Sequence, residues 1–325
     1  MAQGPYEPKI VVIGGGTGLS VLLKGLKKYT TRLTAIVTVT DDGGSSGRLR
    51  TELGVLPPGD IRNCLVALAE TETLMDKVFQ HRFRQSGSLQ GHNLGNLLLV
   101  AMTEIAGDFV SAIKEVSKVL KVRGKVIPST LQHVVLGAYM DDGTTILGET
   151  SIRNSGKKIK KLFLKPEECV PVPETLKAIK EADAVILGPG SLYTSIIPNL
   201  LVRGVAAAIA DSSALTFYIC NIMTEKGETD GFAVSDHLSA ISRYLEEQIF
   251  DYVIVNSGTP DEERMLKYKA EGAEPVETDW EEIRNMGIEV IAEDLLLEGE
   301  VAWHDSDKLA KIIMKTLRIP VSFDS

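Results

Sequence analysis

The stretch KIVVIGGGTG, residues 9–18, places a short apolar run directly before a cluster of glycines. A run that is apolar throughout is typical of a strand covered on both faces, so we predict a strand over Lys9–Ile13. Leucines then recur at helical spacing, which predicts a helix from Thr17 to Tyr29. With the strand-like segment Leu33–Val39 that follows, this part of the chain forms one βαβ unit with a right-handed crossover.

The rest of the chain repeats this alternation around a different middle part. After Pro173, buried strands are predicted at four places, with helices between them (Ala184–Leu187, Leu215–Ile219, Tyr252–Val255, Ile288–Ala292). The middle part contains helices and then strand-like segments, of which His133–Met140 and Thr144–Ile152 are joined by the hairpin signal Asp141-Asp142-Gly143. We expect a single α/β domain over residues 1–325, with a doubly wound, mostly parallel Rossmann-like sheet and a helical and β-hairpin insertion at roughly 59–165.

The composition is that of a globular protein with an acidic balance. The 325 residues carry a formal net charge of −9, which repels nucleic-acid phosphates and favours a small ligand. The 3 cysteines lie far apart, which argues against a disulfide framework or a zinc site. The first residues lack a signal-peptide pattern, and no apolar run approaches the roughly 20 residues of a membrane span. We therefore expect a cytoplasmic protein with no nucleic-acid partner and no membrane span.

The turn Gly14-Gly15-Gly16-Thr17-Gly18 predicts a binding site for an anion. Free N–H groups and the dipole at the start of a helix attract negative charge, and glycines let a phosphate approach the backbone. The turn departs from the dinucleotide fingerprint because Leu19 stands where glycine or alanine is expected, and the chain contains no Walker A loop. The alternative interpretation is a tight turn without a ligand.

The loop DDGGSSGRLR, residues 41–50, is first acidic and then basic. Carboxylate oxygens are ligands that Mg²⁺ prefers, so Asp41 and Asp42 are candidate metal ligands, with phosphates completing the shell. Arg48 or Arg50 is a candidate clamp for a phosphate, and Asp42 and Gly43 are candidate ligand-binding residues beside Arg48. The alternative is a solvated loop whose aspartates cap the next helix.

Further polar segments are predicted to border the same crevice. Two of them precede or open helices, PPGDIRN at 57–63 and GHNLGN at 91–96. GPGSLYTS at 188–195 follows a buried strand and forms a second glycine-rich cradle, and another polar segment follows the next strand. The alternative for each is a structural role, such as a capped helix or a buried histidine. The candidate ligand-binding residues in these segments are Arg62, Asn63, His92, Asn93, Asn96, Gly190, Ser191, Tyr193, Thr194 and Asn221.

Several of these motifs together resemble a known family. GGGTG, DDGGSSGRLR, PPGDIRN, GHNLGN, GPGSLYTSIIPN and CNIMTEKGETDGF occur in this order. They resemble the YvcK-type gluconeogenesis factors, within the wider group of CofD-like 2-phospho-L-lactate transferases. The resemblance runs from about Lys9 to about Lys315. It implies a cytoplasmic bacterial protein that is needed for normal cell shape on gluconeogenic carbon sources. It also implies binding of a nucleotide sugar such as UDP-N-acetylglucosamine, with no established catalytic activity.

The resemblance also implies roles for single residues. The glycine turns hold a nucleoside diphosphate, and the acid at Asp41 or Asp42 lies near a divalent metal. The segment of Tyr268 and the stretch before His304 approach the nucleotide sugar. Trp303 stands where many relatives have arginine.

The resemblance leaves cofactors, partners and an alternative function as expectations. No cofactor is required, with Mg²⁺ as an option, and we expect a homo-oligomer that works with cell-wall synthesis regulators or a kinase. Ser306 is the candidate kinase substrate, and its alternative role is the N-cap of the last helix. The alternative function is a Mg²⁺-dependent transferase with a nucleoside-diphosphate-linked donor, and an NAD(P)-dependent oxidoreductase is the weakest of the three.

Overall fold

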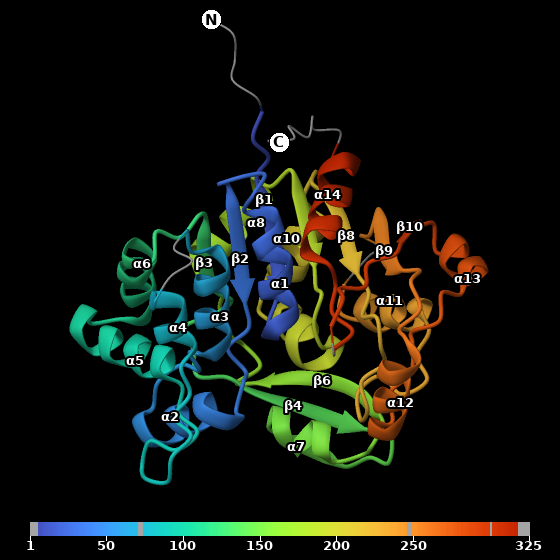
Figure 1. Cartoon of the computed structure of the whole chain (residues 1–325). Helices are drawn as coiled ribbons and strands as arrows, with labels where there is room; N and C mark the ends of the chain where they lie inside the picture. Colours follow the sequence, from blue (N-terminus) through green and yellow to red (C-terminus); the bar gives the residue numbers. More distant parts are fainter. Residues whose placement is uncertain (1–5, 71–73, 246–248, 300, 318–325) are drawn as a thin grey trace, which may run out of the picture.

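A parallel sheet of seven strands organises the molecule, with the strand order β10-β9-β8-β7-β1-β2-β3 (Figure 1). The computed structural model describes residues 6–70, 74–245, 249–299 and 301–317. Every pairing in this sheet is parallel, as the sequence predicts for a doubly wound fold. The strands are β1 (Ile10–Gly14), β2 (Leu33–Val37), β3 (Lys125–Pro128), β7 (Ala184–Leu187), β8 (Leu215–Ile219), β9 (Tyr252–Asn256) and β10 (Glu289–Glu293).

Helices cover both faces of this sheet. On one face α1 (Gly16–Leu26) packs between α3 (Gly59–Leu68) and α14 (Ser306–Thr316), while α8 (Pro173–Lys180) and α10 (Val205–Ala210) lie behind the sheet in Figure 1. The approach of α14 to α1 requires a glycine, because a β-carbon on Gly25 would lie 2.0 Å from the carbonyl oxygen of Ser306. The remaining helices are α2 (Gly44–Leu53), α4 (Leu74–Gln80), α5 (Leu94–Ala106), α6 (Phe109–Val119), α7 (Glu149–Asn154), the π-helix η1 (Leu192–Ile196), α9 (Ile197–Leu200), α11 (Val234–Ser242), α12 (Glu262–Glu271) and α13 (Trp280–Asn285).

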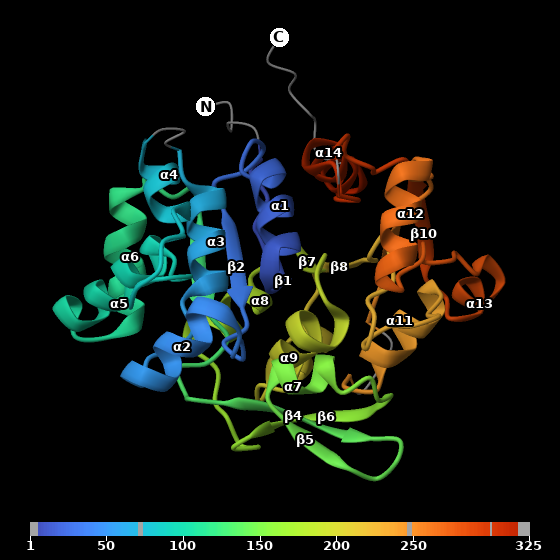
Figure 2. The ribbon, with the colours of Figure 1, turned by 60° about the horizontal axis from the view of Figure 1, so that its bottom comes forward.

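A second sheet of three antiparallel strands, in the order β5-β4-β6, lies beyond the carboxyl end of the main sheet (Figure 2). It consists of β4 (Val135–Met140), β5 (Thr145–Leu147) and β6 (Ile159–Lys165), and it confirms the predicted hairpin. The expected strand Thr144–Ile152 is wrong beyond Leu147. Gly148 turns the chain with a φ of 95°, and α7 then begins, because Asp42 accepts a hydrogen bond from the backbone N–H of Thr150 at 2.9 Å.

Two further expectations differ from the structure. The segment expected as an insertion contributes β3 to the main sheet, where it pairs with β2 as an edge strand. The N-cap of α14 is Asp305, whose carboxylate accepts from the N–H groups of Asp307 and Lys308, so Ser306 is the first helical residue instead. Among the described residues no single helix is both long and apolar enough to cross a membrane. The consecutive helices α5 and α6 reach the length and apolar composition of a membrane span only when they are taken together, and the angle between them is 117°.

Candidate functional site

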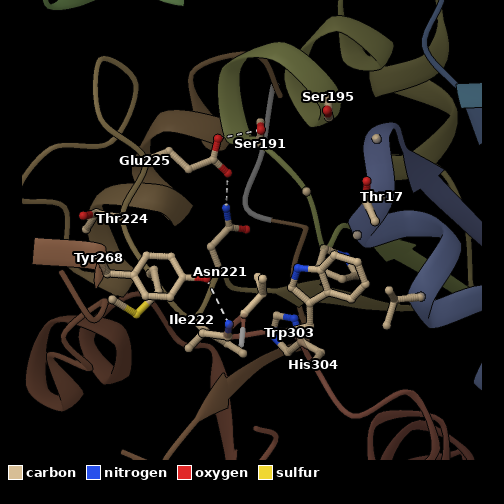
Figure 3. Close-up of a pocket in the computed structure, with 18 residues that line it drawn as sticks. Thr17, Ser191, Ser195, Asn221, Ile222, Thr224, Glu225, Tyr268, Trp303 and His304 are labelled. Atoms are coloured by element: carbon tan, nitrogen blue, oxygen red, sulfur yellow. Dashed lines mark hydrogen bonds between the residues drawn. The ribbon is translucent and has the colours of Figure 1, made fainter. Parts of the chain in front are cut away.

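A cavity of about 320 Å³ opens at the carboxyl end of the main sheet, where β1 lies between β2 and β7. In a doubly wound sheet this is the point at which the strand order reverses, and it is where ligands bind. Residues that follow five different strands line it (Figure 3): Gly16, Thr17, Gly18, Val21, Pro189, Gly190, Ser191, Ser195, Asn221, Ile222, Met223, Thr224, Glu225, Tyr268, Val301, Ala302, Trp303 and His304.

The first wall is the start of α1. Gly15 precedes the helix without a capping side chain, and the first turn of α1 carries no acidic residue. Gly16 has a φ of 66°, a left-handed conformation that favours glycine. Asp60 accepts a hydrogen bond from the N–H of Gly16, and the helix dipole with the other N–H groups of this first turn suits the wall to a negatively charged group.

The second wall combines the turn after β7 with the segment after β8. The hydroxyl of Ser191 donates to Oε2 of Glu225 at 2.6 Å, and Nδ2 of Asn221 donates to Oε1 of the same carboxylate at 2.8 Å. Glu225 therefore fixes two cavity-lining side chains that are 30 residues apart in the chain. This places hydroxyl and amide groups opposite the start of α1, where they suit a ligand rich in oxygen.

The third wall is aromatic. Tyr268 of α12 accepts, through its hydroxyl, the backbone N–H of Ala302 at 2.9 Å, which joins α12 to the segment before α14. Trp303 keeps 45% of its surface exposed at the cavity. Burial lowers the pKa of His304 to about 4, so this imidazole is neutral at pH 7, and its Nε2 lies 3.2 Å from the carbonyl oxygen of Cys220.

Beside the cavity, behind the glycine turn, lies a cluster of carboxyl groups. Burial, with the nearby Asp41 carboxylate, raises the pKa of Asp60 to about 6, although Asp60 accepts a hydrogen bond from the N–H of Gly16. Burial, with Asp41 and Asp60, also raises the pKa of Glu149 to about 9. Glu228 pairs with Arg153 at 3.2 Å. Several acids share this small volume, so some of them hold protons at neutral pH.

The cavity brings together only part of the predicted ligand-binding residues. Gly16, Thr17, Gly18, Gly190, Ser191, Asn221 and Tyr268 line it. Gly14, Gly15, Tyr193 and Thr194 belong to the same turns but do not line it. Their contacts are internal. Gly14 accepts from Asn199, Thr194 donates to Glu228 at 3.1 Å, and the ring of Tyr193 packs edge-on against Phe232.

The candidate metal ligands Asp41 and Asp42 contact different elements. Oδ1 of Asp41 accepts from the N–H of Gly43 at 2.9 Å, whereas Oδ1 of Asp42 accepts from the hydroxyl of Thr150 at 2.6 Å. The described part of the chain contains no group of three or more histidine, cysteine, aspartate or glutamate side chains arranged to hold a metal ion. The expected Mg²⁺ site at Asp41 and Asp42, with phosphates completing the shell, stays a prediction.

The remaining candidates form a separate buried cluster between α2, α3 and α5. His92 Nδ1 lies 3.3 Å from the hydroxyl of Ser45, which also accepts from Asn96 Nδ2 and from the N–H of Asn93 at 3.2 Å each. Arg62 donates to Asn96 and Asn63 at 3.0 Å and 2.6 Å. Arg48 donates to the carbonyl of Gln90 at 2.6 Å. In these contacts the polar residues join helices to one another, and their role in ligand binding stays a prediction.

Sequence reasoning missed the two acidic residues that organise the region. Glu225 lies within the motif CNIMTEKGETDGF, four residues after Asn221, and Glu149 lies in the expected strand Thr144–Ile152. Ser195 was within a quoted motif but was not selected, although its side chain lies against both Gly15 and Gly190. The signals for Glu225 are its place in that motif and its position after a buried strand.

The comparisons with known proteins agree over nearly the whole chain. The family model described as 2-phospho-L-lactate transferase CofD matches residues 10–296. The gluconeogenesis factor of Halalkalibacterium halodurans is 51% identical over 310 residues, 95% of this chain and 96% of the relative. The gluconeogenesis factor of Bacillus subtilis is 50% identical over 313 residues, which cover 96% of this chain and 99% of the relative. A crystal structure of a UPF0052 family member from Bacillus halodurans has 50% identity and a TM-score of 0.92, and it covers 95% of this chain and 99% of its own.

Proposed function

Because this chain belongs to the CofD family, and within it is similar to the gluconeogenesis factors, we propose that it is a regulatory factor that binds a nucleotide sugar. The ligand is of the UDP-N-acetylglucosamine type. The bound state then controls cell shape during growth on gluconeogenic carbon sources, through partner proteins of cell-wall synthesis.

The observation that carries this proposal is the pairing of an anion-binding wall with an aromatic wall in one cavity. The start of α1 at Gly16–Gly18 suits the diphosphate, because the positive end of the helix dipole lies there and the first turn of α1 itself carries no acidic residue. Tyr268 and Trp303 line the same cavity and suit the base, since flat rings stack on aromatic side chains. Ser191 and Glu225 between them offer hydrogen bonds to ribose or sugar hydroxyls.

A titration with UDP-N-acetylglucosamine tests the binding. At 100 times its Kd the ligand raises the free energy of unfolding by about 2.7 kcal/mol, which thermal melting detects. Thr17→Glu places a carboxylate at the first turn of α1, which suits the helix but repels a diphosphate. Thr17→Gln has the same length without the charge. We expect the glutamate variant to fold and lose the shift, and the glutamine variant to keep it. Equal binding by both variants would contradict this position for the diphosphate.

The proposed role in cell shape has its own test. In a Bacillus subtilis strain without its gluconeogenesis factor, this chain should restore rod shape on a gluconeogenic carbon source. The Thr17→Glu variant should not restore it, whereas Thr17→Gln should. Full rescue by the glutamate variant would separate the cellular role from ligand binding.

The carboxyl cluster favours a second candidate function, a transferase that takes a nucleoside-diphosphate-linked donor. Asp60 has a pKa of about 6 and lies directly behind the turn that starts α1, so it suits a general base for an attacking hydroxyl. The assay is the release of nucleoside monophosphate from such a donor in the presence of an acceptor and Mg²⁺. Turnover that Asp60→Asn removes would favour the transferase. No release over hours would favour the regulatory factor.

A further inference from the structure

Asn221 presents an unused hydrogen-bond acceptor to the cavity. It follows β8 directly, and its Oδ1 atom is buried without a hydrogen-bond partner in the described part of the chain. Buried polar atoms are normally paired, and an unpaired one costs about 1–3 kcal/mol. An unpaired acceptor on a cavity wall therefore marks a position at which a ligand supplies the donor.

The orientation of this amide follows from its neighbour. Glu225 is a carboxylate and accepts hydrogen bonds only, and it already accepts from the hydroxyl of Ser191 at 2.6 Å. Asn221 must therefore turn its NH₂ group toward Glu225, 2.8 Å away, and its oxygen toward the cavity. The charge of Glu225 thus decides which end of the amide a ligand meets.

The surroundings of Asn221 suit a flat ring. In the view of Figure 3, Tyr268 and Trp303 lie on either side of Asn221, and Ile222 lies below it. Aromatic and apolar side chains bind the faces of a base, while a single polar group at its edge provides selectivity. In the view of Figure 3, the side-chain oxygen of Asn221 points away from Glu225 and to the side on which Trp303 lies.

We propose that Asn221 selects the base of the nucleotide by accepting the ring N–H of uracil. This inference rests on the proposed function, because it assigns the base end of the same ligand. Uracil carries a hydrogen at N3 that satisfies Oδ1, whereas cytosine has a lone pair at N3 that would face another lone pair. A site built to accept one hydrogen bond rejects an analogue that lacks the donor, so we expect about 10- to 100-fold weaker binding of the cytidine analogue.

Isothermal titration of the unmodified protein with three ligands tests the proposal without any variant. UDP should bind, and N3-methyl-UDP and CDP should each bind about 10- to 100-fold more weakly. The N3-methyl compound keeps the ring and the diphosphate and removes only the donor. N3-methyl-UDP that binds within twofold of UDP would overturn the inference and leave the proposed function intact. No binding of any of the three would overturn both.

The variant Asn221→Leu completes the cycle. It removes the acceptor and keeps a side chain of similar size. The affinity for UDP should therefore fall to the affinity for N3-methyl-UDP, while the affinity for N3-methyl-UDP itself should change little. A loss of equal size for both ligands would mean that Asn221 supports the fold of the cavity and does not contact N3. Asn285→Leu makes the same substitution at an exposed position of α13, outside the cavity, and as the control it should keep the preference for UDP.

Discussion

Gly18 and Pro189 hold the two glycine-rich turns in direct contact, since a β-carbon on Gly18 would lie 2.6 Å from the carbonyl oxygen of Pro189. Gly18 belongs to the first turn of α1, and Pro189 follows β7, the strand next to β1. The two walls of the cavity therefore touch backbone to backbone. No side chain at residue 18 fits without moving one of them.

Gly18→Ala should separate the two turns. The methyl group meets backbone atoms that cannot rotate away, so we expect a net loss of about 1–3 kcal/mol in the free energy of unfolding, measured with urea, and a loss of nucleotide binding. Gly14→Ala is the matched control, because its β-carbon would lie 3.7 Å from the nearest atom, a side-chain carbon of Leu19. A Gly18→Ala variant as stable as Gly14→Ala would contradict the close contact.

Trp303 should report ligand binding by fluorescence. The chain contains 2 tryptophans, and only Trp303 lines the cavity, whereas Trp280 lies in α13. A base that stacks on the indole should quench the emission, and Trp303→Phe should abolish this change while Trp280→Phe keeps it. Trp303→Ala should also cost about 1–3 kcal/mol of binding free energy. Quenching that persists in Trp303→Phe would place the base elsewhere.

The fold was largely predictable because its signals are local. Continuous apolar runs marked β1, β7, β8 and β9 to within about two residues. The strand assigned to Thr144–Ile152 failed because a partner 108 residues away acts on it, the carboxylate of Asp42 that receives the N–H of Thr150. Local pattern carries no information about such a contact.

The site was only partly predictable, for a topological reason. Asp41 follows β2, on one side of β1, whereas Gly188 follows β7, on the other side. The order of the elements in the sequence does not show that β7 pairs with the edge of β1 that faces away from β2. The loops that follow β2 and β7 were therefore expected to face one crevice. The cavity instead lies on the β7 and β8 side, and the cluster around Arg62 packs between helices.

Asn199 connects the turn after β7 to the turn after β1, and its replacement by aspartate should lower the free energy of unfolding. It is fully buried, and its Nδ2 donates to the carbonyls of Gly14 at 3.1 Å and Ser195 at 2.8 Å. Asn199→Asp replaces this donor by an acceptor of the same shape, so we expect a loss of about 2–4 kcal/mol in urea unfolding. Asn285→Asp, at an exposed position of α13, is the control and should change stability little. Equal stabilities of the two variants would contradict the role of this side chain.

Glu149 should make the stability of the protein depend on pH. Burial, with the nearby Asp41 and Asp60, raises its pKa from 4.5 to about 9, so the folded chain holds a proton that the unfolded chain releases. This contribution is fully present below about pH 4.5 and is lost as the pH rises through about 9. Glu149→Gln imitates the protonated form. The free energy of unfolding of this variant, relative to that of the wild type, should rise by roughly 1–3 kcal/mol between pH 5 and 8.5.

Urea unfolding at pH 5, 7 and 8.5 measures this difference. The exposed Glu168 supplies the control, since Glu168→Gln removes the same charge at a solvated position and should give a difference that does not vary with pH. Arg153, which lies 4.0 Å from Glu149, opposes the effect by favouring the ionised carboxylate, and Arg153→Met should therefore enlarge it. A constant difference for Glu149→Gln across the three pH values would mean that this carboxyl group is ionised throughout. The cluster behind the glycine turn would then carry more negative charge than its burial favours, and Arg153 would be the side chain that offsets it.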